Sequence, residues 1–180
     1  MTRVARLATD VGPAGLVPAA WGLTVAAVFT PLVTDRTLLI ALVVMDVLLA
    51  AFYVATRDEM TGPVLGAWRR VLVAGLAANL VGTAGLLVAP GARALLAVPL
   101  YAWMVLPGLG YVRTWRETPT GLPRALYGLS AAGSLVGAGL YAVAPLVAGG
   151  DGPAALAGLV AVGAGQTAGI VTAAVENAGS

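Results

Sequence analysis

The chain has 180 residues, of which 59% are hydrophobic and only 10% are charged, with ten basic and eight acidic side chains. A soluble domain carries about 25% charged residues because its surface faces water, so this composition excludes a single soluble domain. The apolar content excludes a disordered chain, and the absence of cysteine excludes a disulfide-bonded secreted domain. We therefore expect an all-α, polytopic membrane protein that forms one membrane-embedded domain over residues 1–180.

Six apolar stretches are long enough to cross about 30 Å of hydrocarbon as helices, which takes about 20 residues each. The stretches are continuous rather than alternating, which favours helices over barrel strands. In the last turn between them, Asp151 is the predicted N-cap and Pro153 the predicted first helical residue. The six predicted spans are residues 12–33, 37–56, 70–89, 94–112, 125–147 and 153–175.

The arginines are unevenly divided between the two ends of these spans. Only Arg36 and Arg93 fall on one side of the membrane, and the other arginines fall on the opposite side. Short loops rich in arginine are typical of the cytoplasmic side, so the opposite side is predicted to face the cytoplasm. Both termini are therefore predicted to be cytoplasmic, in a protein of the cell membrane, and the first span is too long for a cleaved signal peptide. The arginines of the cytoplasmic side are Arg3, Arg6, Arg57, Arg69, Arg70, Arg113, Arg116 and Arg124.

Parts of the chain repeat each other. Residues 80–90 and 135–145 share six of eleven identities, and residues 53–59 resemble residues 111–117. This pattern predicts that the hairpin of the second and third spans was duplicated as the fourth and fifth. Such parallel repeats occur in some transporters, but membrane bundles also grow by duplication, so repetition leaves transport and structural roles both open.

Asp46 lies near the centre of the second span, where an ionised carboxylate costs at least about 3 kcal/mol. It must therefore be protonated, face water or the bundle, or find a hydrogen-bond donor. Asn79 lies at the same depth in the third span, and Thr83 shares its face because the two are four residues apart. The duplication places Tyr101 and Ser134 at a similar depth in the other hairpin.

Two hypotheses about these residues stay open at this point. In the first, Asp46, Asn79, Tyr101, Trp103 and Ser134 line a ligand or ion pocket, and Asp46 binds a proton or cation in a small permease or channel. In the second, Asp46 is a neutral acid that ties two helices together through a hydrogen bond to Asn79. The sequence offers no second acid at this depth for a proton relay.

Prolines interrupt two of the spans. Pro18 and Pro31 fall in the first and Pro99 and Pro107 in the fourth, and each removes one backbone hydrogen bond and frees a carbonyl. Residues 99–111 of the fourth span contain both of its prolines together with two tyrosines and a tryptophan. This segment is a candidate site for a lipid, quinone or other apolar ligand. The alternative is a kinked helix whose aromatic side chains simply pack.

Small residues recur at every fourth position along the last span, which allows close approach of a second helix. This row predicts a tight contact with the fifth helix or with another subunit, either in a homo-oligomer or with a membrane partner. It therefore favours a structural or accessory role as the alternative to transport. The residues of the row are Ala157, Ala161, Gly165, Gly169 and Ala173.

The sequence has no Cys, His or Lys. The ordinary protein ligands of haem, zinc and iron–sulfur clusters are therefore missing, as is the lysine of a Schiff base, and we expect no cofactor and no metal. The one acid–base cluster, around Asp58, Glu59 and Glu117, is interpreted as two solvated loops that exchange ion pairs, so a non-enzymatic protein is favoured. With net charge +2 and dispersed arginines we expect no nucleic-acid partner, and the prevalence of residues with GC-rich codons indicates a prokaryotic source.

Overall fold

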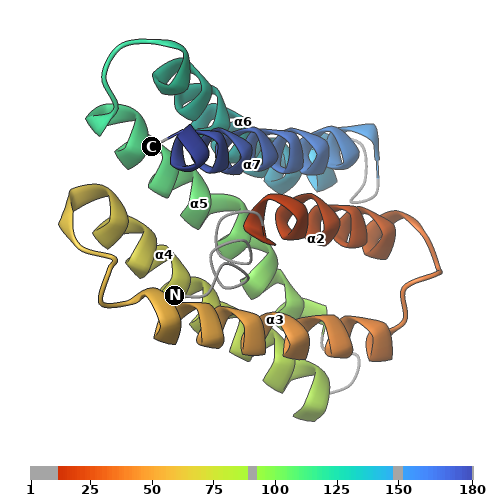
Figure 1. Cartoon of the computed structure of the whole chain (residues 1–180). Helices are drawn as coiled ribbons and strands as arrows, with labels where there is room; N and C mark the ends of the chain where they lie inside the picture. Colours follow the sequence, from red (N-terminus) through yellow and green to blue (C-terminus); the bar gives the residue numbers. More distant parts are fainter. Residues whose placement is uncertain (1–11, 89–92, 148–151, 180) are drawn as a thin grey trace.

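A computed structural model describes residues 12–88, 93–147 and 152–179, which are helical apart from short turns and contain no strand (Figure 1). The expected all-α bundle is confirmed. Its elements are α2 (Gly12–Phe29), α3 (Asp35–Thr56), α4 (Gly62–Val88), the 3₁₀ helix η1 (Arg93–Leu96), α5 (Ala97–Glu117), α6 (Leu122–Val147) and α7 (Pro153–Gly179).

Five of these helices, α3 to α7, are long and apolar enough to cross a membrane, so the chain is a multi-pass membrane protein. The apolar part of α2, Ala14–Phe29, is shorter than the others. The first span was predicted to reach residue 33, which is wrong. The helix ends at Phe29 because a proline disfavours helical backbone at the preceding residue, so Pro31 lies in the following turn instead of inside the helix.

Two other predicted boundaries are wrong by five residues or more, because the charged residues there lie within the helices and do not end them. The helix α4 begins at Gly62 rather than at residue 70, and α5 continues to Glu117 rather than ending at residue 112. Arginine side chains can extend from a helix end toward water, so such ends project beyond the hydrocarbon. Smaller differences occur at the beginning of α6, Leu122 rather than residue 125, and at the end of α7, Gly179 rather than residue 175. The helix α7 begins at Pro153 as predicted, while Asp151 lies outside the described residues.

The helices form two groups joined by α5 (Figure 1). The helix α3 packs on α4 in one group, α6 and α7 pack together in the other with α2 on α7, and α5 contacts α4 and α6. The main core is formed by Trp21, Met104, Ala138, Leu159 and Val162, from α2, α5, α6 and α7. Consequently α3 is peripheral: 11% of its apolar span is buried, against 33% for α5, α6 and α7.

The contact between α6 and α7 brings two backbones together. A Cβ atom added at Gly137 would lie 2.6 Å from the backbone oxygen of Gly158, and one added at Gly165 would lie 3.2 Å from the Cα of Gly133. Only glycine fits such an approach. Close packing of this kind drives helix association in membranes, because lipid offers no hydrophobic contrast.

The predicted row of small residues follows this contact only in part. Gly165 faces α6 and Gly169 faces the ring of Tyr111 on α5, whereas Ala157 is exposed. A row of every fourth residue turns by about 40° at each step, so it drifts off any single face of the helix. A row of residues that stays buried or half-buried along α7 instead has alternating intervals of four and three residues. Its members are Gly158, Val162, Gly165, Gly169 and Thr172.

Candidate functional site

Asp46 is half-buried between α3 and α4, where both of its carboxyl oxygens accept hydrogen bonds. Asn79 Nδ2 donates to Asp46 Oδ1 at 3.0 Å, and Thr83 Oγ1 donates to Asp46 Oδ2 at 2.7 Å. Asn79 and Thr83 are themselves buried. They lie one turn apart on α4, so this helix presents two donors to a single carboxyl group.

Asn79 uses both ends of its side-chain amide. Its Nδ2 also donates to the backbone oxygen of Leu42 at 3.3 Å, and its Oδ1 accepts from the indole Nε1 of Trp103 at 3.2 Å. Trp103 belongs to α5, so Asn79 joins three helices. A fully paired amide in a buried position has one preferred orientation.

Trp103 leads on to a second polar junction. Its backbone oxygen accepts from Gln166 Nε2 of α7 at 2.8 Å, and Gln166 Oε1 accepts from the indole Nε1 of Trp21 of α2 at 3.0 Å. Pro107 lies four residues after Trp103 and has no N–H, so it leaves this carbonyl without its helical partner. Hydrogen bonds therefore connect α3, α4, α5, α7 and α2 in one network.

The structure brings Asp46, Asn79 and Trp103 together but places the other two predicted pocket residues elsewhere. The ring of Tyr101 packs edge-on against Tyr141, with 5.9 Å between ring centroids, and remains 37% exposed. Ser134 is fully buried near Gly165 of α7, and its Oγ has no hydrogen-bond partner among the described residues. Equal depth does not imply a shared face, since Tyr101 and Trp103 lie about 200° apart around α5.

The aromatic side chains of residues 99–111 all contact other parts of the protein. Trp103 is held as described above, and Tyr111 donates to the backbone oxygen of Gln166 at 3.0 Å. The Tyr111 ring also packs edge-on against Trp68, whose indole Nε1 donates to Thr114 Oγ1 at 3.0 Å. These contacts favour a kinked helix with packed aromatic side chains over a site for an apolar ligand.

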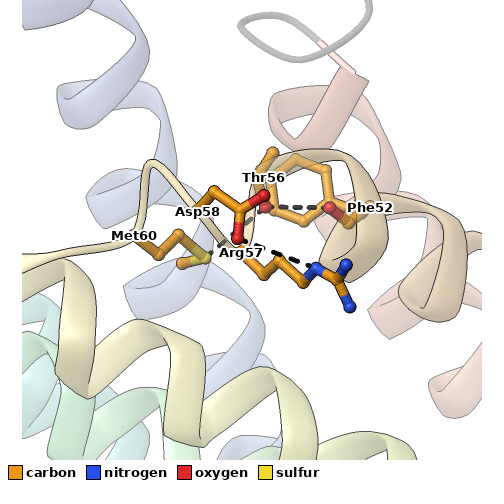
Figure 2. A network of polar contacts seen from close by, with 5 residues as sticks. All are labelled: Phe52, Thr56, Arg57, Asp58 and Met60. Carbon is orange, nitrogen blue, oxygen red and sulfur yellow. Dashed lines mark hydrogen bonds and ion pairs between the residues drawn. The ribbon is translucent and has the colours of Figure 1, made fainter.

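The arginine-rich end of the bundle carries exposed charges. Arg57 and Asp58 pair at 3.8 Å just beyond α3, where Thr56 Oγ1 donates to Phe52 O and to Met60 Sδ (Figure 2), and the Asp58 side chain is 93% exposed. The second ion pair, Arg113 with Glu117 at 2.9 Å, lies within α5. The predicted exchange of ion pairs between the two loops is therefore wrong for the described residues. The two loops do not build a buried acid–base pair.

Sequence reasoning missed the partners that lie far apart in the chain. Gln166 and Trp21 are 145 residues apart, and Tyr127 donates to Glu176 from the beginning of α6 to the end of α7. A donor to the backbone carbonyl of Trp103 could have been predicted from Pro107, because a buried carbonyl freed by proline requires a hydrogen-bond donor. No sequence pattern indicated which helix would supply that donor.

The chemistry available at the Asp46 site is limited. Within residues 12–88, 93–147 and 152–179, no group of three metal-ligating side chains could hold a metal ion. The indole of Trp103 donates a hydrogen bond but cannot accept one, so the network cannot pass protons along its length. The site therefore offers one carboxyl group held by two hydrogen-bond donors.

Comparison of the chain with models of protein families, with curated proteins and with solved structures finds no match. The fold defines the class, a multi-pass helical membrane protein. A fold alone does not specify a function. Any more specific function must therefore be argued from the chemistry of the Asp46 site.

Proposed function

We propose that the chain is a non-enzymatic membrane protein of the permease or channel type, in which Asp46 is the proton or cation site. One observation carries this proposal: both oxygens of a carboxyl group in the middle of an apolar helix accept hydrogen bonds from the neighbouring helix. Acidic groups inside membrane spans are costly and commonly mark ion pathways.

The hydrogen bonds make the contact between α3 and α4 depend on the charge of Asp46. The ionised carboxylate accepts from both Asn79 and Thr83, so it satisfies both donors. In the neutral form, one oxygen still accepts from Asn79 Nδ2, and the O–H of the other oxygen donates to Thr83, whose hydroxyl can rotate and accept. Both hydrogen bonds then lose the contribution of the charge, which makes such bonds about twice as strong, and α3 can shift because it packs mainly on α4.

A single carboxyl site is consistent with binding and release by one residue rather than with conduction along a chain of acids. The other acidic residues of the described segments lie at helix ends or in turns: Asp35, Asp58, Glu59, Glu117 and Glu176. We therefore expect transport that saturates with the driving ion.

A second candidate is a non-catalytic accessory subunit, in which Asp46 is only a structural tie. This alternative is favoured by the pairing of Asp46, Asn79 and Trp103 inside the chain, and interhelical hydrogen bonds of this kind contribute about 0.6 kcal/mol on average. Such a subunit would need no gradient and no exchange of protons.

The two candidates are separated by flux measurements on purified protein in liposomes, with imposed gradients of H⁺, Na⁺ and K⁺. Asn at position 46 can accept from Asn79 and donate to Thr83 but cannot ionise, so Asp46→Asn is expected to abolish pH-dependent flux while the protein stays folded. Asp35→Asn is the matched control, because Asp35 is exposed at the beginning of the same helix and should leave flux unchanged.

Melting temperatures of the same samples show whether Asp46 also serves as a tie. Asp46→Leu leaves the donors of Asn79 and Thr83 without acceptors, so we expect it to lower the free energy of unfolding by about 1–2 kcal/mol. Absence of flux from the parent protein in every gradient would contradict the permease proposal. Flux that survives Asp46→Asn unchanged would remove Asp46 from the mechanism.

A further inference from the structure

We infer that Trp103 is a positioning residue for Asp46, and that it acts by fixing which end of the Asn79 amide faces the carboxyl group. The inference rests on the proposed role of Asp46 as a titratable site. It does not depend on which ion, if any, the protein transports.

The indole of Trp103 determines the orientation of the Asn79 amide. Indole Nε1–H donates and never accepts, so it must face the amide oxygen, as it does at 3.2 Å from Asn79 Oδ1. The amide nitrogen then points to the other side, where it meets two acceptors, Asp46 Oδ1 at 3.0 Å and Leu42 O at 3.3 Å. A flipped amide would lose all three hydrogen bonds.

This orientation decides whether Asp46 Oδ1 meets a hydrogen-bond donor. With the amide turned the other way, the amide oxygen would face Asp46 Oδ1 in place of the nitrogen. Thr83 donates to the other oxygen whatever the orientation of Asn79. Trp103 therefore controls one of the two hydrogen bonds that hold the Asp46 carboxyl group.

Trp103 can hold Asn79 because its own position is constrained from two sides. The backbone carbonyl that Pro107 frees is bound by Gln166 Nε2. The indole ring lies against Gly75 of α4, where an added Cβ would be 2.7 Å from ring atoms. The position of the indole is thus set by α4 and α7 together, and the donor cannot easily turn away from Asn79.

Other titratable groups on the packed helix lie farther from Asp46. The helix α4, on which α3 packs, carries Arg69 and Arg70 near its beginning, about 14 Å along the helix from Asn79. Within the part of the chain that the structure describes, no hydrogen bond or ion pair joins Asp46 to another titratable side chain. The hydrogen bonds from Asn79 and Thr83 are therefore the polar side-chain contacts of the Asp46 carboxyl group in this part of the chain.

The test is an NMR measurement, at one fixed pH, of the Asp46 carboxyl resonance in protein labelled with ¹³C-aspartate. The sequence has five aspartates, and the Asp46 resonance is assigned by its loss in Asp46→Asn. Trp103→Phe keeps an aromatic ring but removes the donor, and we expect it to shift this resonance by as much as Asn79→Leu does, because the amide nitrogen is no longer held against Asp46 Oδ1. Trp68→Phe is the control, because it removes an indole donor that serves Thr114 and not Asn79 or Gln166, so it should leave the Asp46 resonance unchanged.

A double variant tests whether Trp103 acts through Asn79. In the background Asn79→Leu, Trp103→Phe should cause no further change in the Asp46 resonance, because the residue it positions is gone. An unchanged Asp46 resonance in Trp103→Phe alone would overturn the inference, and so would a shift of equal size in both backgrounds.

A measurement on the parent protein covers the case in which Trp103→Phe does not fold. The indole N–H of Trp103 should exchange slowly with solvent deuterium in the parent protein and faster in Asn79→Leu, which lacks its acceptor. An indole N–H that exchanges at the same rate in both proteins would overturn the inference. Absence of flux in liposomes would contradict only the proposed function, so the two failures are distinguishable.

Discussion

The α3–α4 and α6–α7 contacts join neighbouring helices by different means. In the middle of α6–α7 the backbones touch at Gly137 and Gly158, and the fit depends on shape. In α3–α4 a carboxyl group of a mostly exposed helix binds two side chains of its neighbour. Membrane helices associate through either kind of contact. The contact between α6 and α7 depends on the shape of the two backbones, whereas the contact between α3 and α4 depends on hydrogen bonds to one carboxyl group.

The largest expected effect breaks the contact between α6 and α7. Gly137→Ala places a Cβ 2.6 Å from the backbone oxygen of Gly158, so the two helices must move apart. We expect the free energy of unfolding to fall by about 2–3 kcal/mol, in the upper part of the range for overpacking, as measured by unfolding in mixed micelles.

Gly139→Ala is the matched control for this substitution. Gly139 lies on the same helix, and a Cβ added there meets nothing within 4 Å. Replacing helical glycine by alanine there should leave stability unchanged or raise it slightly. Equal effects of the two substitutions would show that backbone fit does not hold α6 to α7.

A smaller effect is expected at the junction that links the two regions. Gln166→Leu leaves the Trp21 indole and the Trp103 carbonyl without partners, which should cost about 1–2 kcal/mol. In the background Pro107→Ala, residue 107 supplies its own N–H to that carbonyl, so Gln166→Leu should cost about 0.5–1 kcal/mol less. Additive effects in this double-mutant cycle would mean that Gln166 does not compensate for the proline.

The smallest effect is expected at the exposed charges. Glu117→Gln removes the ion pair with Arg113 at 2.9 Å, but both side chains are at least 40% exposed. Exposed pairs one helical turn apart contribute about 0.3–0.5 kcal/mol, and salt screens them. Melting curves at low and high salt should differ little between the variant and the parent. A loss as large as that of Gln166→Leu would mean that these charges also determine stability.

Local patterns predicted one half of the polar network. A lone acid at mid-span required a donor, and the short connection after α3 made the next helix its neighbour, so the hydrogen bond between Asp46 and Asn79 was predictable. Thr83 followed from its spacing to Asn79. The other half, Gln166 with Trp103 and Trp21, depends on which distant helices meet, and hydrophobic periodicity contains no such information.

Depth and spacing misled where helix rotation decides the outcome. Tyr101 and Ser134 lie at the depth of Asp46 but face other helices, and Ala157 belongs to a row that turns away from the contact. Hydropathy determines how far a residue lies into a membrane, whereas the packing of neighbouring helices determines its direction. The fold class could therefore be predicted from the sequence, and the members of the pocket only in part.

Distances between spin labels test most directly whether Asp46 holds α3 to the bundle. The chain has no cysteine, so pairs introduced at exposed positions, Val47 with Leu80 and Val136 with Val160, report on α3–α4 and α6–α7 separately. We predict that Asp46→Leu broadens the α3–α4 distance distribution and leaves the α6–α7 distribution unchanged. An α3–α4 distribution identical to that of the parent protein would contradict the account.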